Sequence, residues 1–227
     1  MTGHGPATSQ LVLVRSIHRF FWSADEETVA LRDVSLTLAA GEMVALVGPS
    51  GSGKSTLLSI IAGADEPDGG EVHIAGTRIS HRSEAERARL RGRLVGMLFQ
   101  SGNLLPTLTV RDNIALAQRV GRTSRRSDIA MVLESLGLAA FATAYPRQLS
   151  GGELARAGLA VAAAAAPPLL LADEPTAELD ERTEERVLDL LAAQARRGGA
   201  VLVAGHSPAL TVAADRVVTL RDGRLVA

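Results

Sequence analysis

A glycine-rich segment at residues 48–56 has the composition of a loop that binds phosphate. It reads Gly-Pro-Ser-Gly-Ser-Gly-Lys-Ser-Thr and matches the pattern G-x-x-x-x-G-K-[ST] between an expected strand and an expected helix. The glycines let backbone N–H groups surround an anion, and the helix N-terminus adds a positive dipole end. We expect Lys54 to reach the β- and γ-phosphates of a nucleotide and the Ser55 hydroxyl to ligate Mg²⁺. The expected phosphate contacts are Gly48, Pro49, Ser50, Gly51, Ser52, Gly53, Lys54, Ser55 and Thr56.

A pair of acids follows the apolar run 169–172. Phosphoryl transfer needs a metal ligand and a group that positions water. We expect Asp173 to hold Mg²⁺, directly or through water, and Glu174 to polarise a water molecule against the γ-phosphate. A capping or surface role for the two acids before Pro175 is the alternative, and the phosphate-binding loop in the same chain favours the catalytic one.

A second glycine-containing segment, Leu149-Ser150-Gly151-Gly152-Glu153, precedes an alanine-rich stretch that is typical of a helix. Ser150 and Glu153 fit an S-x-x-E capping box, which satisfies backbone donors at a helix start. The box does not explain Gly151 and Gly152, because glycine costs conformational entropy in a helix. Small residues at the start of a helix also favour the binding of an anion by the backbone N–H groups there. The segment therefore predicts either a simple cap or a second phosphate-binding element.

Four apolar runs without alternation, typical of strands covered on both faces, precede these polar groups. The runs are 43–47, 94–99, 169–172 and 201–204, and they lead into the loop at 48–56, Gln100, Asp173-Glu174 and His206. Ligands of open α/β sheets bind beyond the carboxyl ends of the strands. If the four strands are parallel, these groups converge on one edge.

Other segments indicate the rest of the architecture. Alternating apolar residues at 34–38 and 72–74, and a hairpin signal at Asp222-Gly223, predict an antiparallel layer. Residues 101–160 have helical patterns, and we expect them to form a subdomain inserted into an α/β core made of 11–100 and 161–227. Residues 1–10 are expected to be a loose tail.

Composition excludes several classes of protein. The 227 residues include no Cys, which rules out disulfides and Cys-based zinc sites. The 24 basic and 25 acidic residues give a net charge of −1, which argues against a dedicated nucleic-acid binder. No run of roughly 18 apolar residues is present, and the N-terminus lacks the pattern of a signal peptide, so we expect neither a membrane span nor an export signal.

Over about residues 11–227 the chain resembles the ATP-binding subunits of ABC transporters. The resemblance rests on the loop at 48–56, Gln100, LSGGE at 149–153, the strand and acids at 169–176, Leu179-Asp180 and His206. Leu90-Arg91-Gly92, Phe99-Gln100 and the segment 103–110 resemble the branch that serves lipoprotein release, macrolide export and cell division. The resemblance implies a P-loop NTPase core of the RecA-like type, with an antiparallel β layer and an inserted helical signature subdomain.

The resemblance also implies a mechanism in which two subunits pair head to tail. ATP held by Lys54 of one subunit is covered by Ser150, Gly151 and Gly152 of the other. Gln100 is expected to sense Mg²⁺ or the attacking water and to link to the membrane partner. His206 is expected to contact the γ-phosphate and Asp180 to lie at the dimer seam.

An aromatic residue near the N-terminus is expected to stack on adenine. The register of the preceding apolar residues favours Phe21, with Phe20 and Trp22 adjacent. Core packing of these aromatic rings is the alternative, and stacking on a base is typically worth about 1–3 kcal/mol.

The leading hypothesis is a hydrolysing subunit, peripheral at the cytoplasmic face of the membrane, that binds Mg-ATP and powers a separate permease of an exporter-like complex. A soluble ATPase acting on ribosomes or DNA is a second hypothesis, but the chain has one cassette and no long heptad run. A binding module with little turnover is a third, against which Glu174 and His206 count. Departures from the family pattern at Leu154, Ala155, Val161 and Ser207 remove no phosphate, metal or water group, and bear on turnover and coupling.

Overall fold

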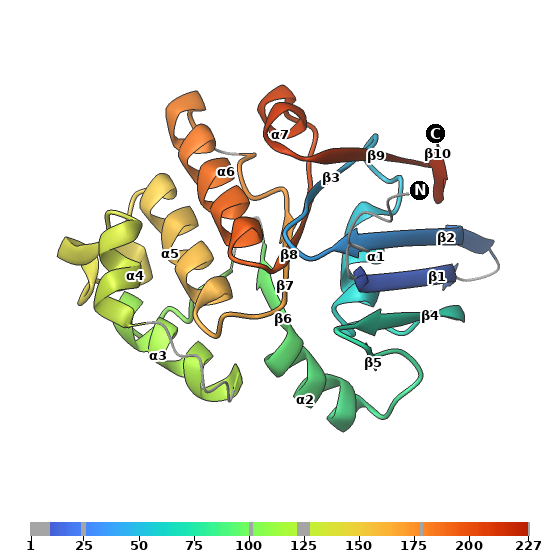
Figure 1. The fold of residues 1–227 in the computed structure, drawn as a ribbon, viewed down its shortest axis with the longest axis horizontal. Helices are drawn as coiled ribbons and strands as arrows, with labels where there is room; N and C mark the ends of the chain where they lie inside the picture. Colours follow the sequence, from blue (N-terminus) through green and yellow to red (C-terminus); the bar gives the residue numbers. More distant parts are fainter. Residues whose placement is uncertain (1–9, 24–25, 100–101, 122–127, 178, 227) are drawn as a thin grey trace, which may run out of the picture.

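A computed structural model describes the chain over residues 10–23, 26–99, 102–121, 128–177 and 179–226. Two β-sheets face each other, and most of the helices lie on the far side of the larger sheet (Figure 1). None of the helices in these ranges is both long and apolar enough to cross a membrane.

The smaller sheet is antiparallel and has the strand order β2-β1-β4-β5. It contains β1 (Gln10–Ser23), β2 (Glu26–Ala39), β4 (Gly69–Ile74) and β5 (Thr77–Arg78). The apolar side chains of Val34, Leu36 and Leu38 in β2 are buried. The polar side chains of Ser35 and Thr37 alternate with them and lie on the other face of the sheet. The expected antiparallel layer is thus confirmed for these strands.

The larger sheet has the order β10-β9-β3-β8-β7-β6. Its strands are β3 (Met43–Val47), β6 (Val95–Leu98), β7 (Leu169–Asp173), β8 (Ala200–Ala204), β9 (Arg216–Arg221) and β10 (Arg224–Val226). β3, β8, β7 and β6 run parallel to one another, as their apolar composition predicts. Their carboxyl ends therefore meet at one edge of the sheet.

The hairpin of β9 and β10 forms at Asp222-Gly223 as expected, but its assignment to the antiparallel layer is wrong. β9 pairs in parallel with β3, with Val44 opposite Arg216 and Val47 opposite Thr219. The turn signal specifies only the local pairing of β9 with β10. The sheet that a hairpin joins depends on the path of the preceding chain, which here crosses over from β8 through α7 (Pro208–Ala213).

Seven α-helices lie in the described residues. Besides α7 they are α1 (Lys54–Ile61), α2 (Glu84–Leu94), α3 (Val110–Gly121), α4 (Ile129–Ser135), α5 (Gly151–Ala163) and α6 (Glu181–Arg196), with short 3₁₀ turns at Ala139–Phe141 and Pro146–Gln148. None of the α2 side chains is fully buried, although Leu90 and Leu94 pack partly buried against the core, and a capping box of Ser83 and Glu86 starts the helix. α5 continues three residues past the expected subdomain boundary at residue 160, and the domain limits stay a prediction.

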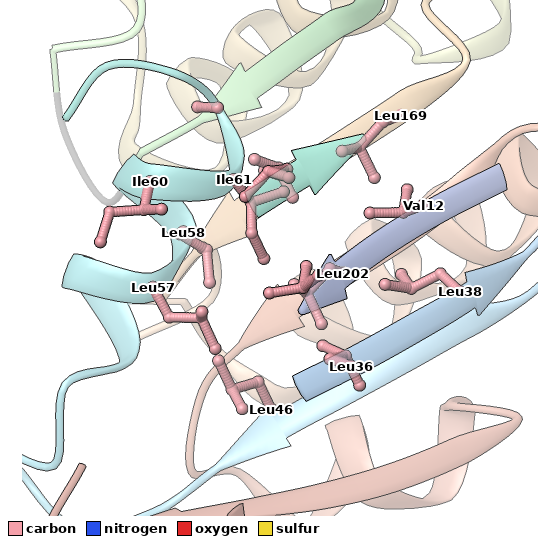
Figure 2. Packing of buried hydrophobic residues seen from close by; sticks show 14 of the residues in the cluster. Val12, Leu36, Leu38, Leu46, Leu57, Leu58, Ile60, Ile61, Leu169 and Leu202 are labelled. Atoms are coloured by element: carbon pink, nitrogen blue, oxygen red, sulfur yellow. The ribbon is translucent and has the colours of Figure 1, made fainter. Parts of the chain in front are cut away.

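One hydrophobic core fixes the helix that follows the glycine-rich loop. Figure 2 shows the apolar side chains of α1 between the two sheets. The labelled residues are Leu57, Leu58, Ile60 and Ile61 of α1, Leu46, Leu169 and Leu202 of the larger sheet, and Val12, Leu36 and Leu38 of the smaller one. Truncating such a buried leucine to alanine typically costs about 2–5 kcal/mol. α1 is therefore held firmly, and it presents its N-terminus at the carboxyl edge of the sheet.

A second core lies on the other face of the larger sheet, under α3, α5, α6 and α7. α5 packs closely on β6 because two glycines leave room for it. A Cβ built on Gly96 would lie 2.1 Å from the Ala162 carbonyl oxygen, and one on Gly158 would lie 3.0 Å from Leu98 Cδ1. The start of α5, with its Ser150-Gly151-Gly152 segment, is thereby set relative to the sheet.

Candidate active site

The loop at residues 48–53 joins β3 to α1 in a conformation that requires glycine. Gly48, Gly51 and Gly53 all have positive φ angles. A Cβ on Gly48 would lie 2.1 Å from the Leu220 carbonyl oxygen, and one on Gly53 would lie 2.6 Å from that of Ala30. The glycines thus serve both backbone conformation and close packing.

α1 differs from the helices α2, α5 and α6 in having no side-chain cap at its N-terminus. Its N-cap residue is Gly53, so the first N–H groups of the helix have no side-chain acceptor. Unpaired N–H groups at the positive end of a helix dipole attract an anion. This local structure can hold phosphate.

Lys54 is the cation of this loop. Its side chain is buried, and its ammonium Nζ donates to the carbonyl oxygens of Gly48 at 2.9 Å and Pro49 at 3.3 Å. Within the described parts of the chain it forms no ion pair with a carboxylate. A buried ammonium without a counter-ion favours a bound anion.

A cavity of about 740 Å³ opens over this loop. Its volume is in the range of small-molecule sites. It is lined by Phe21, by Thr28, Val29 and Ala30 of β2, by all residues from Gly48 to Thr56, and by Glu174 and His206. The structure thus gathers the expected phosphate loop, Glu174, His206 and Phe21 around one space. The sequence analysis did not predict the cavity residues of β2, Thr28, Val29 and Ala30, because nothing in their residue types indicates a binding site.

Glu174 follows the last residue of β7 and faces His206. The Glu174 Oε2 and His206 Nδ1 atoms are 3.0 Å apart, and the two side chains are 24% and 73% exposed. Glu174 has φ 47°, in the left-handed region that non-glycine residues rarely adopt. Such a conformation costs on the order of 1–3 kcal/mol and is found where surrounding structure enforces it. The carboxylate is aimed at the cavity by a strained but ordered backbone.

Asp173, the final residue of β7, carries a carboxylate oxygen that needs a partner. Its Oδ1 is buried and makes no hydrogen bond to any described residue, and the same holds for the buried Ser52 Oγ. An unpaired buried carboxylate oxygen is costly unless a cation or water meets it. Hard oxygen donors from Asp173 and Ser55 suit Mg²⁺, which takes its other ligands from water and phosphate. In the described residues no group of three His, Asp or Glu side chains could hold a metal by itself. The residues present therefore fit a magnesium ion brought in with a nucleotide.

Ser150 caps α5. Its Oγ accepts from the Glu153 N–H at 3.4 Å, and Glu153 Oε2 accepts from the Ser150 N–H at 2.8 Å, completing the capping box. The hydrogen bond from the Ser150 backbone lowers the pKa of Glu153. The capping prediction is thus confirmed, while a role in phosphate binding stays a prediction.

The two glycines after Ser150 have different surroundings. A Cβ on Gly152 would lie 3.0 Å from Thr183 Cγ2, so close packing on α6 explains this glycine. A Cβ on the exposed Gly151 would meet nothing within 4 Å, so packing inside the chain does not explain Gly151. Ser150, Gly151 and Gly152 do not line the cavity over the phosphate loop.

The remaining predicted site residues are placed as follows. Asp180 is the N-cap of α6 and accepts from the N–H and hydroxyl of Thr183, at 3.1 and 2.8 Å, which lowers the pKa of Asp180. Phe21 is 41% exposed, and the Arg19 guanidinium carbon lies 4.7 Å from its ring centroid. Trp22 is also exposed, so neither ring is in the core, and of the two only Phe21 lines the cavity. Gln100 lies outside the described residues.

Comparisons with known proteins agree with this site. Residues 31–177 match the family model described as ABC transporter. An uncharacterized ABC transporter ATP-binding protein of Mycobacterium tuberculosis H37Rv is 41% identical over 220 residues, covering 95% of this chain and 89% of that protein. The lipoprotein-releasing system ATP-binding protein LolD of Anaeromyxobacter dehalogenans is 40% identical over 227 residues, covering 98% and 95%.

A solved structure is similar over nearly its whole length. The ATP-binding cassette MJ0796, in a dimeric post-hydrolysis state bound to ADP and Pi, superposes with a TM-score of 0.87 at 33% identity, covering 95% of this chain and 97% of that one. The likeness extends to the P-loop fold and its two sheets. With the phosphate loop, Asp173 and Glu174 in place, and with residues 31–177 matching the family model, this chain belongs to the ABC transporter family of ATP-binding proteins.

Proposed function

We propose that this chain hydrolyses ATP in a head-to-tail dimer of ATP-binding subunits and thereby powers a separate membrane permease. The observation that carries the proposal is the position of the Ser150 segment. It has an exposed glycine with no packing role, yet it lies outside the chain's own cavity. A second subunit would bring such a segment to the ATP held by the first.

The phosphate loop, Glu174 and His206 of the cavity, together with Asp173 next to Glu174, have distinct roles in the reaction of ATP with water to give ADP and phosphate. The loop N–H groups and Lys54 hold the β- and γ-phosphates. Asp173 and Ser55 would hold Mg²⁺, which neutralises charge on the phosphate oxygens. The Glu174 carboxylate orients the attacking water and acts as the general base that accepts its proton. His206 holds this carboxylate in place through the 3.0 Å contact between Nδ1 and Oε2.

The remaining parts of the proposal come from the relatives. Dimeric cassette structures similar to this chain support pairing of two subunits. The LolD relatives are named for lipoprotein release, which supports a permease of an exporter that handles lipoproteins, peptides or drugs. Such a subunit is peripheral at the cytoplasmic face of the membrane. Ser150, Gly151, Gly152 and Asp180 then lie at the subunit seam.

Mixing of two inactive variants tests the shared site. Ser150→Ala damages the segment that this chain contributes to the ATP site of its partner. Lys54→Ala damages the phosphate loop of the chain's own ATP site. A heterodimer of the two contains one site with both defects and one intact site. We expect partial recovery of ATPase activity on mixing, while each variant alone is inactive. Full activity of Ser150→Ala alone, or no recovery despite demonstrated heterodimers, would contradict the proposal.

A further inference from the structure

The first turn of α6 has contacts to two segments that the proposed function places in different ATP sites. Thr183 and Glu184 are adjacent in sequence, but their side chains contact different loops. Glu184 Oε1 accepts a hydrogen bond of 2.9 Å from the Thr176 hydroxyl. Thr183 Cγ2 lies 3.0 Å from the position of a Cβ on Gly152. One helical turn therefore touches both the loop after Glu174 and the start of α5.

The Glu184 contact stabilises the loop that carries Glu174. Glu174 has a left-handed backbone, so the residues around it must hold it there. Its N–H donates to the Ala204 carbonyl at 2.9 Å, and the Leu179 N–H donates to the Thr176 carbonyl at 3.1 Å. Over the described part of this loop, the bond from Thr176 to Glu184 is the side-chain link between the loop and α6. Both partners are half-buried, which shields the bond from competing water.

The Thr183 contact concerns the other segment. The Thr183 hydroxyl donates to Asp180 Oδ2 at 2.8 Å, which fixes the side chain and directs its methyl group to Gly152. Gly152 belongs to the first turn of α5 and is the second residue after Ser150. Close packing transmits small displacements, because interiors have little free volume. The methyl group of Thr183 thus packs against the first turn of α5, which also carries Gly151 and follows Ser150.

We propose that Thr183 and Glu184 are positioning residues that act on opposite ATP sites of the dimer. Glu184 positions Glu174 in the chain's own site, and Thr183 positions the Ser150 segment that completes the partner's site. Neither side chain touches nucleotide. This inference rests on the proposed head-to-tail function and adds to it a rigid link, through one turn of α6, between the two half-sites of each chain.

Single variants measure the two contacts separately. Glu184→Ala removes the acceptor for Thr176, whereas Glu184→Gln keeps one. Thr183→Ser removes the methyl group but keeps the hydroxyl for Asp180. Glu185→Ala is the matched control, because Glu185 is an exposed acid of the same helix whose side chain forms no hydrogen bond or ion pair with the described residues. We expect kcat to fall about 10- to 100-fold in Glu184→Ala and about tenfold in Thr183→Ser, because small misplacements of catalytic groups have such effects.

ATP affinity and thermal unfolding of each variant serve as the check on folding, and both should stay close to wild type. Glu184→Gln should recover most of the lost kcat, and Glu185→Ala should match wild type. If kcat of Glu184→Ala is normal, or if Glu184→Gln is as poor as Glu184→Ala, the role of Glu184 as a hydrogen-bonded positioning residue is wrong. A normal kcat in Thr183→Ser would overturn the role of its methyl group.

Mixing then assigns each defect to a site. Glu184→Ala chains should regain activity with Ser150→Ala chains but not with Lys54→Ala chains. Thr183→Ser chains should show the reverse, recovering with Lys54→Ala and not with Ser150→Ala. If Glu184→Ala and Thr183→Ser both recover activity with the same one of these two partner variants, the inference is wrong. The pair Ser150→Ala and Lys54→Ala is the reference. If that pair fails to recover, the proposed head-to-tail function is wrong, which is distinct from failure of the present inference.

Discussion

Replacing Glu174 by glutamine tests the catalytic centre with little change to the fold. The amide has the size of the carboxylate and can still pair with His206 Nδ1 across the present 3.0 Å. The left-handed backbone at φ 47° costs glutamine and glutamate a similar amount, and the side chain is partly exposed. We therefore expect the free energy of unfolding to change by less than about 0.5 kcal/mol. The neutral amide cannot act as a general base toward water, so we expect turnover to fall about 10²- to 10⁴-fold. That loss corresponds to roughly 3–5 kcal/mol in the activation barrier.

Three measurements on Glu174→Gln separate chemistry from binding. A multiple-turnover ATPase assay gives kcat, equilibrium titration with a fluorescent ATP analogue gives affinity, and light scattering gives the oligomeric state. We expect low kcat, unchanged affinity and a dimer that persists with Mg-ATP. Glu185→Gln, the same chemical change on an exposed acid, should behave as wild type. Near-normal turnover of Glu174→Gln in a folded protein would refute the assignment of Glu174 as the group that activates water.

Further predictions concern the phosphate loop, the aromatic residue and the cap of α5. Lys54→Ala should weaken ATP binding at least tenfold, because a charge buried in the loop is lost, and unchanged affinity in titrations would exclude the loop as the main phosphate site. Phe21→Ala should weaken ATP binding about 5- to 100-fold and leave inorganic triphosphate binding unchanged, since stacking on adenine is worth about 1–3 kcal/mol; Trp22→Ala is the matched control, and equal effects of the two variants would contradict the role of Phe21. The lowered pKa of Glu153 means that its stabilising contribution is present above the ordinary value of 4.5 and is lost as the pH falls through the lower folded value. Unfolding midpoints between pH 7 and 3 should therefore fall less steeply in Glu153→Gln than in wild type, and identical slopes would refute this.

Local sequence signals predicted most of the elements that position the site. The apolar runs before residues 48 and 173 identified β3 and β7, and the capping box of Ser150 and Glu153 identified the start of α5. Each of these elements has a pattern within its own residues, either a continuous apolar run or a capping box at its start. Their parallel pairing then follows from burial on both faces.

Features that depend on distant parts of the chain were not predicted. The sheet that β9 joins is decided by its pairing with β3, which no residue of β9 specifies. α2 packs only Leu90 and Leu94 against the core, so it gave no periodic signal, and the sequence analysis did not predict it. The contacts of Thr183 and Glu184 arise only when α6 packs beside α5 and the loop after β7. Their residue types fit an ordinary first helical turn, so sequence alone gave no reason to select them.

Cross-linking between chains tests the shared ATP site most directly. The chain contains no Cys, so single cysteines can be introduced without background. One chain carries Ser50→Cys at the exposed tip of the phosphate loop, and the other carries Gly151→Cys, both with Glu174→Gln to retain ATP. A short thiol-specific cross-linker should join the two different chains with Mg-ATP and not with ADP, and neither cysteine variant alone should cross-link. Cross-linking that is independent of ATP, or that joins two Ser50→Cys chains as readily as the mixed pair, would contradict a site shared head to tail.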